Sequence, residues 1–401
     1  MEGDQITQTC KELCDGASMV PETIKTYLSL LRRSYFCVAL FCALLVLNSC
    51  TTENSLDTHA NVPSASNAGN YLKGRVAYNN HDLNDATSSF REALKKNPND
   101  NLLLRRSFIA ELEAGNLDYA IKLAEHALKQ QKISIFMHLV IGLRDAKKGN
   151  WDKALDNFNK MGSSQVNEIL NPLLRGWSYL GKGDLLKTRQ NLLSLKEKRG
   201  FELLSLLHTA LALQGQEKIT VIDKLFDEAI GSVGASPSRL ALSVANYYQK
   251  TGRNDKAIYL IDKIKSKDFN LEMLKGRIRT TKGPSLSEVT VKSPQDGISE
   301  ALFDIANALR EDYNNNASLI FIRLANYIRP NFYSAKILLG EILEERGKYR
   351  EAVKEFEQIP EESIFFRMAQ LRLSQTLRQH DKPHAAIRVL EKLQRRQPKN
   401  A

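Results

Sequence analysis

Residues 74–98 read GRVAYNNHDLNDATSSFREALKKNP, and their small and apolar positions recur about every thirty-four residues along most of the chain. Three positions of the repeat carry the pattern: a small residue in a first helix, a turn residue, and an apolar residue in a second helix. The contact position of the first helix, usually a small residue, holds Gly74, Phe108, Gly142, Gly176 and Ala210; the turn holds His81, Gly115, Gly149, Gly183 and Glu217; the apolar position holds Phe90, Ala124, Phe158, Leu192 and Phe226. A small residue lets two helices approach closely, and a glycine in the turn tolerates a positive φ.

The spacing resembles a known repeat family. Its positions Gly74, Ala77, Tyr78, Ala86, Phe90, Ala93 and Pro98 match the second half of the consensus W-x2-L-G-x2-Y…A-x3-F…P. This consensus is that of the tetratricopeptide repeat (TPR), in which each unit is two antiparallel helices. The resemblance implies an all-α fold, a right-handed α-solenoid of about nine helix-turn-helix repeats in two blocks.

The repeat register predicts the domain organisation. Residues 67–268 hold about six repeats, and residues 299–401 hold three more in the original period. Between them, residues 269–298 comprise a truncated repeat and a junction loop. Residues 281–297 contain two prolines and two glycines and no helical period, so we expect a loop or an extended crossover there.

The first fifty residues resemble the leader of a bacterial lipoprotein. The basic pair Arg32-Arg33 precedes thirteen apolar residues at 35–47, which suits a cleaved signal over 1–49 better than a spanning helix. The following Leu47-Asn48-Ser49-Cys50 is similar to a lipobox and implies lipidation of Cys50, although Asn48 departs from the usual small residue. Residues 50–66 would then be a lipidated cysteine and a flexible tether. The alternative is an uncleaved, short inner-membrane anchor.

Two further expectations follow from this resemblance. A threonine at position 51, in place of aspartate, implies sorting to the outer membrane, with the repeats facing the periplasm. Because the leader is long, we expect Met19 to be a possible true start. Cys50 would be the one cysteine to survive cleavage, since all five cysteines lie at or before it, so the repeats can form no disulfide and no cysteine-ligated metal site.

Composition excludes several functions. The net charge is +11, but the basic residues are scattered in short pairs without interleaved aromatics, so we expect no nucleic-acid binding. No phosphate-binding, dinucleotide, zinc-protease or nucleophile-elbow motif is present. His380 and His384 are predicted to lie at a turn, where they would be exposed turn residues, and His138 and His208 in apolar helices are predicted to be packed. We therefore expect no enzyme activity, no cofactor and no metal.

The predicted groove is where a partner would bind. In this family the first helix of each unit lines the concave face, and in the third to fifth repeats these helices are apolar nearly all round. The groove positions predicted to bind protein are Phe136, Leu139, Leu143, Leu170, Leu173, Trp177, Leu204, Leu207 and Leu211. We call these nine residues the trough. Two interpretations are open: a site for an apolar helix or extended segment of another protein, or tight packing against neighbouring repeats or residues 281–297.

The sequence thus favours a lipid-anchored periplasmic scaffold that binds another envelope protein, non-catalytically, through its groove. The alternative is a solenoid that binds a small ligand such as a lipid or a glycan directly. Sugar binding would need stacked aromatic rings, and only Trp177 and Tyr71 offer them in the groove. Lipid binding would need a closed cavity.

Overall fold

A computed structural model describes residues 66–130, 135–231, 238–262, 271–280, 286–312 and 314–395, and these residues form helices and turns with no strand. Ala65–Ala401 make one compact unit. The predicted signal, Cys50 and the tether up to residue 65 lie outside the described residues. Within them, every helix is too short or too polar to cross a bilayer.

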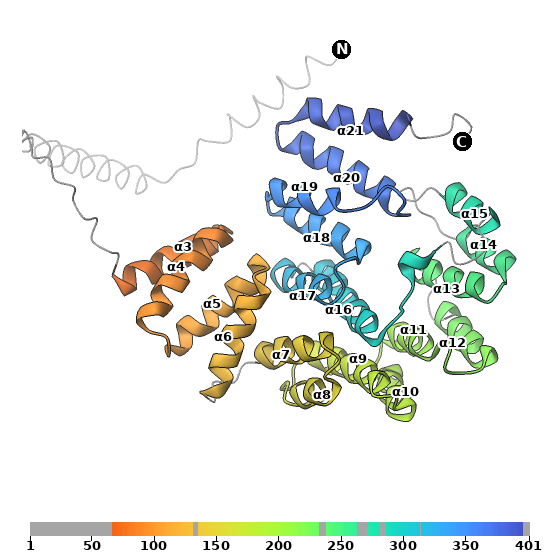
Figure 1. Cartoon of the computed structure of the whole chain (residues 1–401), viewed down its shortest axis with the longest axis horizontal. Helices are drawn as coiled ribbons and strands as arrows, with labels where there is room; N and C mark the ends of the chain where they lie inside the picture. Colours follow the sequence, from red (N-terminus) through yellow and green to blue (C-terminus); the bar gives the residue numbers. More distant parts are fainter. Residues whose placement is uncertain are drawn as a thin grey trace, which may run out of the picture. The chain divides into compact units, whose positions relative to one another are not determined.

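The described helices follow one another as antiparallel pairs (Figure 1). They are α3 Asn67–Asn79, α4 Leu83–Lys96, α5 Asn101–Ala114, α6 Leu117–Lys129, α7 Ile135–Lys147, α8 Trp151–Asn159, α9 Gln165–Gly181, α10 Leu185–Leu193, the 3-10 turn η1 Ser194–Glu197, α11 Glu202–Leu213, α12 Ile219–Gly231, α13 Ser238–Lys250, α14 Asn254–Asp262, α15 Leu271–Thr280, the 3-10 turn η2 Ser287–Val289, α16 Pro294–Glu311, α17 Asn315–Ile328, α18 Tyr333–Glu345, α19 Tyr349–Glu357, α20 Phe366–Gln379 and α21 Pro383–Arg395. The all-α solenoid of helix pairs predicted from the sequence is confirmed.

Turns with a left-handed residue separate the two helices of a unit. The backbone φ is positive at His81, Gly115, Gly149, Gly183, Gly252, Gly347 and Asp381. In the fifth unit the prediction was wrong by two residues: Gly215 has the positive φ of 77°, and Glu217 does not. Glycine takes this conformation without steric cost, so the turn forms where the glycine stands.

Small residues in the first helices let the second helices pack closely. A Cβ added to Gly74 would lie 2.6 Å from the ring of Phe90. The same contact recurs between Gly142 and Phe158, Gly176 and Leu192, and Gly340 and Phe356. Since real Cβ atoms do not approach so closely, a larger residue would push the two helices of the unit apart. The two columns read from the sequence are therefore one packing contact repeated along the chain.

The junction differs from the prediction. Residues 281–285 lie outside the described part, but residues 294–297, expected in the loop, form the first turn of α16. Ser293 caps this helix by accepting a hydrogen bond from Asp296 N, and Pro294 occupies its first turn. Proline is well suited to that position because its missing N–H has no helical partner there. The proline read as a helix breaker is thus a helix start.

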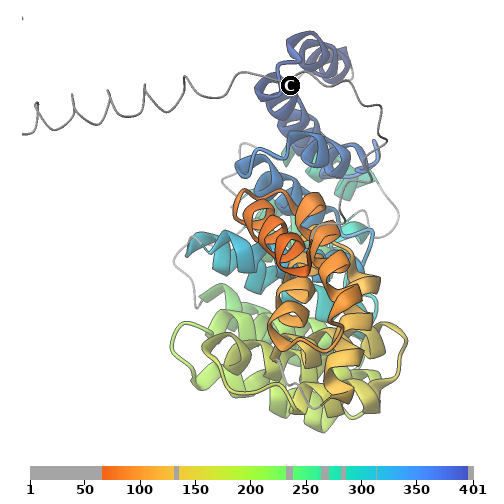
Figure 2. The ribbon, with the colours of Figure 1, turned by 90° about the vertical axis from the view of Figure 1, so that its left-hand side faces the viewer.

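The two blocks pack on one another. α16 contacts α9 and α11, and α17 contacts α5 and α7, so this pair lies against the first helices of the N-terminal block. Figures 1 and 2 both show α16 and α17 between the N-terminal helices and the blue helices that follow them. We call the side of α5, α7, α9 and α11 that faces this pair the inner face.

Candidate binding site on the inner face

The nine trough residues lie on α7, α9 and α11 and are mostly inaccessible. Six are buried: Leu139, Leu143, Leu170, Leu173, Trp177 and Leu211. The remaining three, Phe136, Leu204 and Leu207, are half-buried. The three helices that carry these residues are already in contact with α16 or α17 of the same chain. Part of the 281–297 segment considered from the sequence belongs to this contact, because residues 294–297 are the first turn of α16 and Gly297 packs on Trp177.

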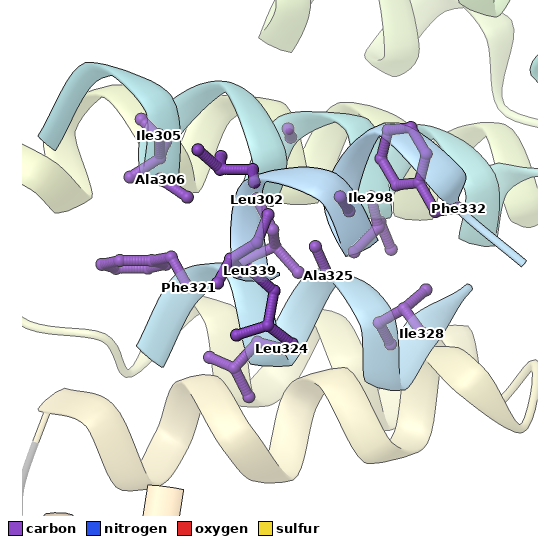
Figure 3. Close-up of a cluster of buried hydrophobic side chains, with 14 of the residues drawn as sticks. Ile298, Leu302, Ile305, Ala306, Phe321, Leu324, Ala325, Ile328, Phe332 and Leu339 are labelled. Atoms are coloured by element: carbon purple, nitrogen blue, oxygen red, sulfur yellow. The ribbon is translucent and has the colours of Figure 1, made fainter. Parts of the chain in front are cut away.

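Aromatic residues mark the contact with α16 and α17. The rings of Phe136 and Phe321 have centroids 6.0 Å apart. Gly297 of α16 lies so close to Trp177 that an added Cβ would be 2.1 Å from the indole Cδ2. Figure 3 shows apolar side chains of α16 and α17, among them Leu302 and Phe321, pointing toward one another and toward α18. Fully burying one such side chain stabilises the folded protein by about 1.5–3 kcal/mol. Because several of these side chains are buried together, the contact is part of the hydrophobic core.

A buried polar chain crosses the same interface. The indole Nε1 of Trp177 donates to Nδ1 of His208 at 2.9 Å, and Nε2 of His208 lies 3.0 Å from Oδ2 of Asp304. Because an indole N–H can only donate, Nδ1 is the acceptor and Nε2 carries the proton donated to Asp304. His208 is fully buried, as expected for a packed histidine. Its two bonds join α9 and α11 to α16.

The prediction that trough residues bind another protein stays a prediction. In this structure another protein could reach Leu173 or Trp177 only after α16 and α17 had moved away. An open hollow lies instead at the N-terminal end of the repeat array.

There, α3, α4 and α5 form an open hollow of about 290 Å³. Its lining is Tyr78, Phe90, Leu102, Arg105, Arg106 and Ile109. Leu102 is 53% exposed, and Leu72 and Val76 on the neighbouring α3 are 57% and 61% exposed. We call the six lining residues the N-terminal hollow. It combines an apolar floor with two arginines.

The charges around the N-terminal hollow are arranged asymmetrically. Glu113 is buried and accepts from the Tyr78 hydroxyl, while Nη1 of Arg346 lies 3.4 Å from its other oxygen. Burial, followed by the hydrogen bond to Glu113, raises the pKa of Tyr78. The carboxylate is thus engaged, whereas Arg105 is exposed and Nε of Arg106 is buried with no hydrogen-bond partner among the described residues. The hollow consequently offers positive charge to a ligand.

A second site was missed by sequence reasoning. Arg323 and Asn326 of α17 line a cavity of about 450 Å³ between the two blocks. A signal existed: both residues interrupt Ser318–Ile328, the apolar run SLIFIRLANYI, at i and i+3 on one helix face. The charged residue and the amide within so apolar a helix could have indicated a polar site.

The described residues contain no cluster of three or more His, Cys, Asp or Glu side chains placed to hold a metal ion. His380 ends α20 and His384 lies in the first turn of α21, so the pair spans a turn as expected. Among the described residues, no third metal ligand lies beside its two imidazoles.

The comparisons with known proteins agree with the repeat pattern. Residues 71–132 match the family described as tetratricopeptide repeat. The chain contains tetratricopeptide repeats. The later helix pairs keep the register of this matched segment, including the positive-φ turn and the glycine contact at Gly340. Tetratricopeptide-repeat proteins are in general non-catalytic scaffolds for protein interaction. No curated protein matches the chain.

Several solved structures of helical-repeat proteins are similar. A tetratricopeptide repeat protein from Parabacteroides merdae is 17% identical, covers 70% of this chain and 100% of its own, and superposes with a TM-score of 0.42. The complex of Naa15/Naa10 bound to HypK-THB is 12% identical over 81% of this chain and 58% of that one, with a TM-score of 0.35. Yeast Tom70 is 13% identical over 81% of this chain and 91% of its own, with a TM-score of 0.23.

Proposed function

We propose that this tetratricopeptide-repeat chain is a lipid-anchored scaffold that binds another protein of the bacterial envelope through the N-terminal hollow. The observation that carries the proposal is the open hollow between α3, α4 and α5, where Leu102 and Arg105 are exposed, whereas the trough helices α7, α9 and α11 are in contact with α16 or α17. The lipobox-like Leu47–Cys50 sequence supports anchoring at Cys50 in the outer membrane, with the repeats in the periplasm.

The lining of the N-terminal hollow selects the kind of segment that would bind. Leu102 and Ile109 offer an apolar floor, and Arg105 and Arg106 stand beside it. A partner segment with a large apolar side chain next to a carboxylate fits both features. The apolar group would supply most of the affinity, and the arginines would set orientation and rate of association.

The docking proposal is tested by crosslinked pull-down from envelope membranes. We compare the native protein with a Leu102→Asp, Arg105→Glu double variant and with Leu186→Asp as the control. Leu102 and Leu186 are both exposed, so folding should tolerate all three substitutions, which circular dichroism verifies. We expect one envelope protein to be recovered by the native chain and by the control, and lost from the double variant. Equal recovery by all three would overturn the proposed site.

The anchoring proposal has its own test. A Cys50→Ser variant should lose palmitate labelling and leave the membrane fraction, because the acyl chains attached to this thiol supply the membrane affinity. A Cys42→Ser control should keep both, since that residue lies in the predicted cleaved segment. Unchanged labelling of the Cys50→Ser variant would contradict lipidation at this position and favour the uncleaved anchor.

A further inference from the structure

The cavity between the two blocks is lined by polar groups of both. From the N-terminal block come Gly115, Asp118 and Lys147; from the C-terminal block come Arg323, Asn326, Tyr327, Lys336 and Glu355. At about 450 Å³ it has room for several non-hydrogen atoms beyond a single water molecule. It is distinct from the N-terminal hollow, and the inference drawn from it does not rest on the proposed function.

The wall formed by α17 carries buried polar atoms that make no hydrogen bond within the described chain. Nε and Nη2 of Arg323 and both amide atoms of Asn326 are buried and make no hydrogen bond there. Nη2 of Arg323 forms an ion pair at 3.5 Å with Oε2 of Glu351, whose side chain is 45% exposed. Leaving one buried polar group unmatched costs about 1–3 kcal/mol, so four such atoms on one helix face call for a ligand.

The cations that line the cavity favour a negatively charged ligand. Burial lowers the pKa of Arg323, and partial burial also lowers the pKa of Lys147. Lys147 donates to the carbonyl oxygen of Tyr327 at 2.5 Å and lies 3.8 Å from the centroid of its ring. The Lys147 ammonium therefore keeps two further donors.

The carboxylates of the lining do not cancel this charge. Asp118 is exposed, and Glu355 lies 3.8 Å from the ammonium of Lys336, whose hydrogen bond goes to Gln358 at 2.7 Å. Both carboxylates thus have water or another cation beside them. At the buried end of the cavity, Arg323 is paired with the partly exposed Glu351 at 3.5 Å, and the amide of Asn326 has no hydrogen-bond partner among the described residues.

We propose that this cavity binds a small oxyanion, a carboxylate or a phosphate, through the Nε–Nη2 edge of Arg323, with Asn326 pairing a hydroxyl or amide group of the same ligand. The guanidinium edge presents two parallel N–H groups, which match two oxygens of a carboxylate or phosphate. The amide of Asn326 offers one donor and one acceptor three residues further along the same face. Lys147, from α7, faces the same space and adds positive charge.

Binding would tie the two blocks together. The lining comes from the turn after α5, from the start of α6 and from α7 on one side, and from α17, α18 and α19 on the other. A ligand that contacts both sides favours the packed arrangement and raises the unfolding temperature by mass action.

The test uses the full chain, with sodium phosphate and sodium succinate as probes and sodium chloride at matched ionic strength as reference. Thermal unfolding and calorimetric titration are recorded for each. We expect a saturable rise in the unfolding temperature with at least one probe beyond the effect of chloride. Phosphate acting alone indicates a phosphate ligand, and succinate acting alone indicates a carboxylate ligand; either result supports the proposal.

Variants assign the effect to the cavity. Arg323→Gln should weaken the probe's apparent affinity about tenfold or more, the loss expected for a charge-assisted pair. Asn326→Asp keeps the shape but places a like charge in the site, and it should weaken binding as strongly. Arg388→Gln on the exposed face of α21 is the control and should bind as the native protein does. No saturable effect of either probe, or equal binding by all folded variants, would overturn the proposal.

Discussion

Gly297, in the first turn of α16, lies directly against the indole of Trp177 on α9: a Cβ at this glycine would stand 2.1 Å from Cδ2 of the ring. Trp177 is fully buried, and the glycine is the reason that a helix from the other block can cover it. The contact fixes how closely α16 approaches the inner face. It also identifies the trough residue with the largest side chain as an internal packing anchor.

Gly297→Ala is therefore expected to destabilise the protein. Forcing a methyl group into a packed contact costs about 1–3 kcal/mol, more than the gain of about 1 kcal/mol from replacing a helical glycine. The measurement is the midpoint of urea unfolding. Gly276→Ala in α15 is the matched control, because an added Cβ there meets nothing within 4 Å, and it should be neutral or stabilising. Equal midpoints for the two variants would contradict a tight α9–α16 contact.

The hydrogen bond from Trp177 to His208 gives a second prediction. His208→Leu leaves the buried indole N–H without an acceptor and should lower the free energy of unfolding by about 1–3 kcal/mol. In a Trp177→Phe background the same substitution should cost clearly less, because the donor is already gone. Calorimetric unfolding of the four proteins of this cycle measures the coupling. If the two substitutions lowered the free energy of unfolding additively, the hydrogen bond between Trp177 and His208 would contribute nothing to stability.

Much of the fold could be predicted from the sequence because each helix pair is local. The glycine at 74 and the phenylalanine at 90 meet within one unit, so their spacing alone predicts the contact. The turn residues likewise follow from glycine's freedom at positive φ. The sequence failed at Pro294, where the same residue type breaks a helix or begins one depending on what precedes it, here the capping Ser293.

The packing of α16 and α17 on the inner face could not be read from periodicity. It is a contact between residues far apart in the chain, and no repeat column encodes it. Helices that are apolar nearly all round, as around Leu173, predict burial on a second side but not what covers it. The cover could equally have been another protein. The cavity lined by Arg323 and Asn326 could not be predicted for the same reason, because it forms only where the two blocks pack together.

A pH dependence follows from Asp223 on α12. Two hydrogen bonds from Arg253, and a further one at 2.7 Å from the Tyr247 hydroxyl, hold the pKa of this carboxyl below its ordinary value of 3.8. Burial, followed by the bond to Asp223, raises the pKa of Tyr247 to about 12, so the hydroxyl keeps its proton near neutrality. A lowered carboxyl pKa means that this stabilisation is present above the ordinary pKa and is lost as the pH falls through the lowered one.

We expect Asp223→Asn to be less stable than the native protein at pH 7 by about 1 kcal/mol, since the pair is partly exposed and screened. The difference should shrink as the pH falls below about 3.8, where the native carboxyl also becomes neutral. Urea midpoints across this range provide the measurement. Asp156→Asn is the control, because its pair with Lys160 is largely exposed and should add little at any pH. A constant difference down to pH 2 would exclude the charge of Asp223 as its source.

Thiol labelling distinguishes the two interpretations of the trough. The five native cysteines all lie in the first fifty residues and can be replaced by serine, which leaves the repeats free of thiols. In that background Leu173→Cys places a thiol at a fully buried position, and Leu186→Cys places one at a position that is 68% exposed. If α16 and α17 cover the inner face, labelling at 173 requires their local opening and should be slower by about a hundredfold or more.

Adding the protein recovered in the pull-down completes this experiment. A partner bound at the N-terminal hollow leaves the slow labelling at 173 unchanged, because α16 stays in place. A partner that enters the trough must displace α16 and would change the labelling at 173 while leaving that at 186 as it was. Fast labelling at 173 in the isolated chain, in a variant that circular dichroism shows to be folded, would mean that the inner face is open and that the trough itself is available to another protein.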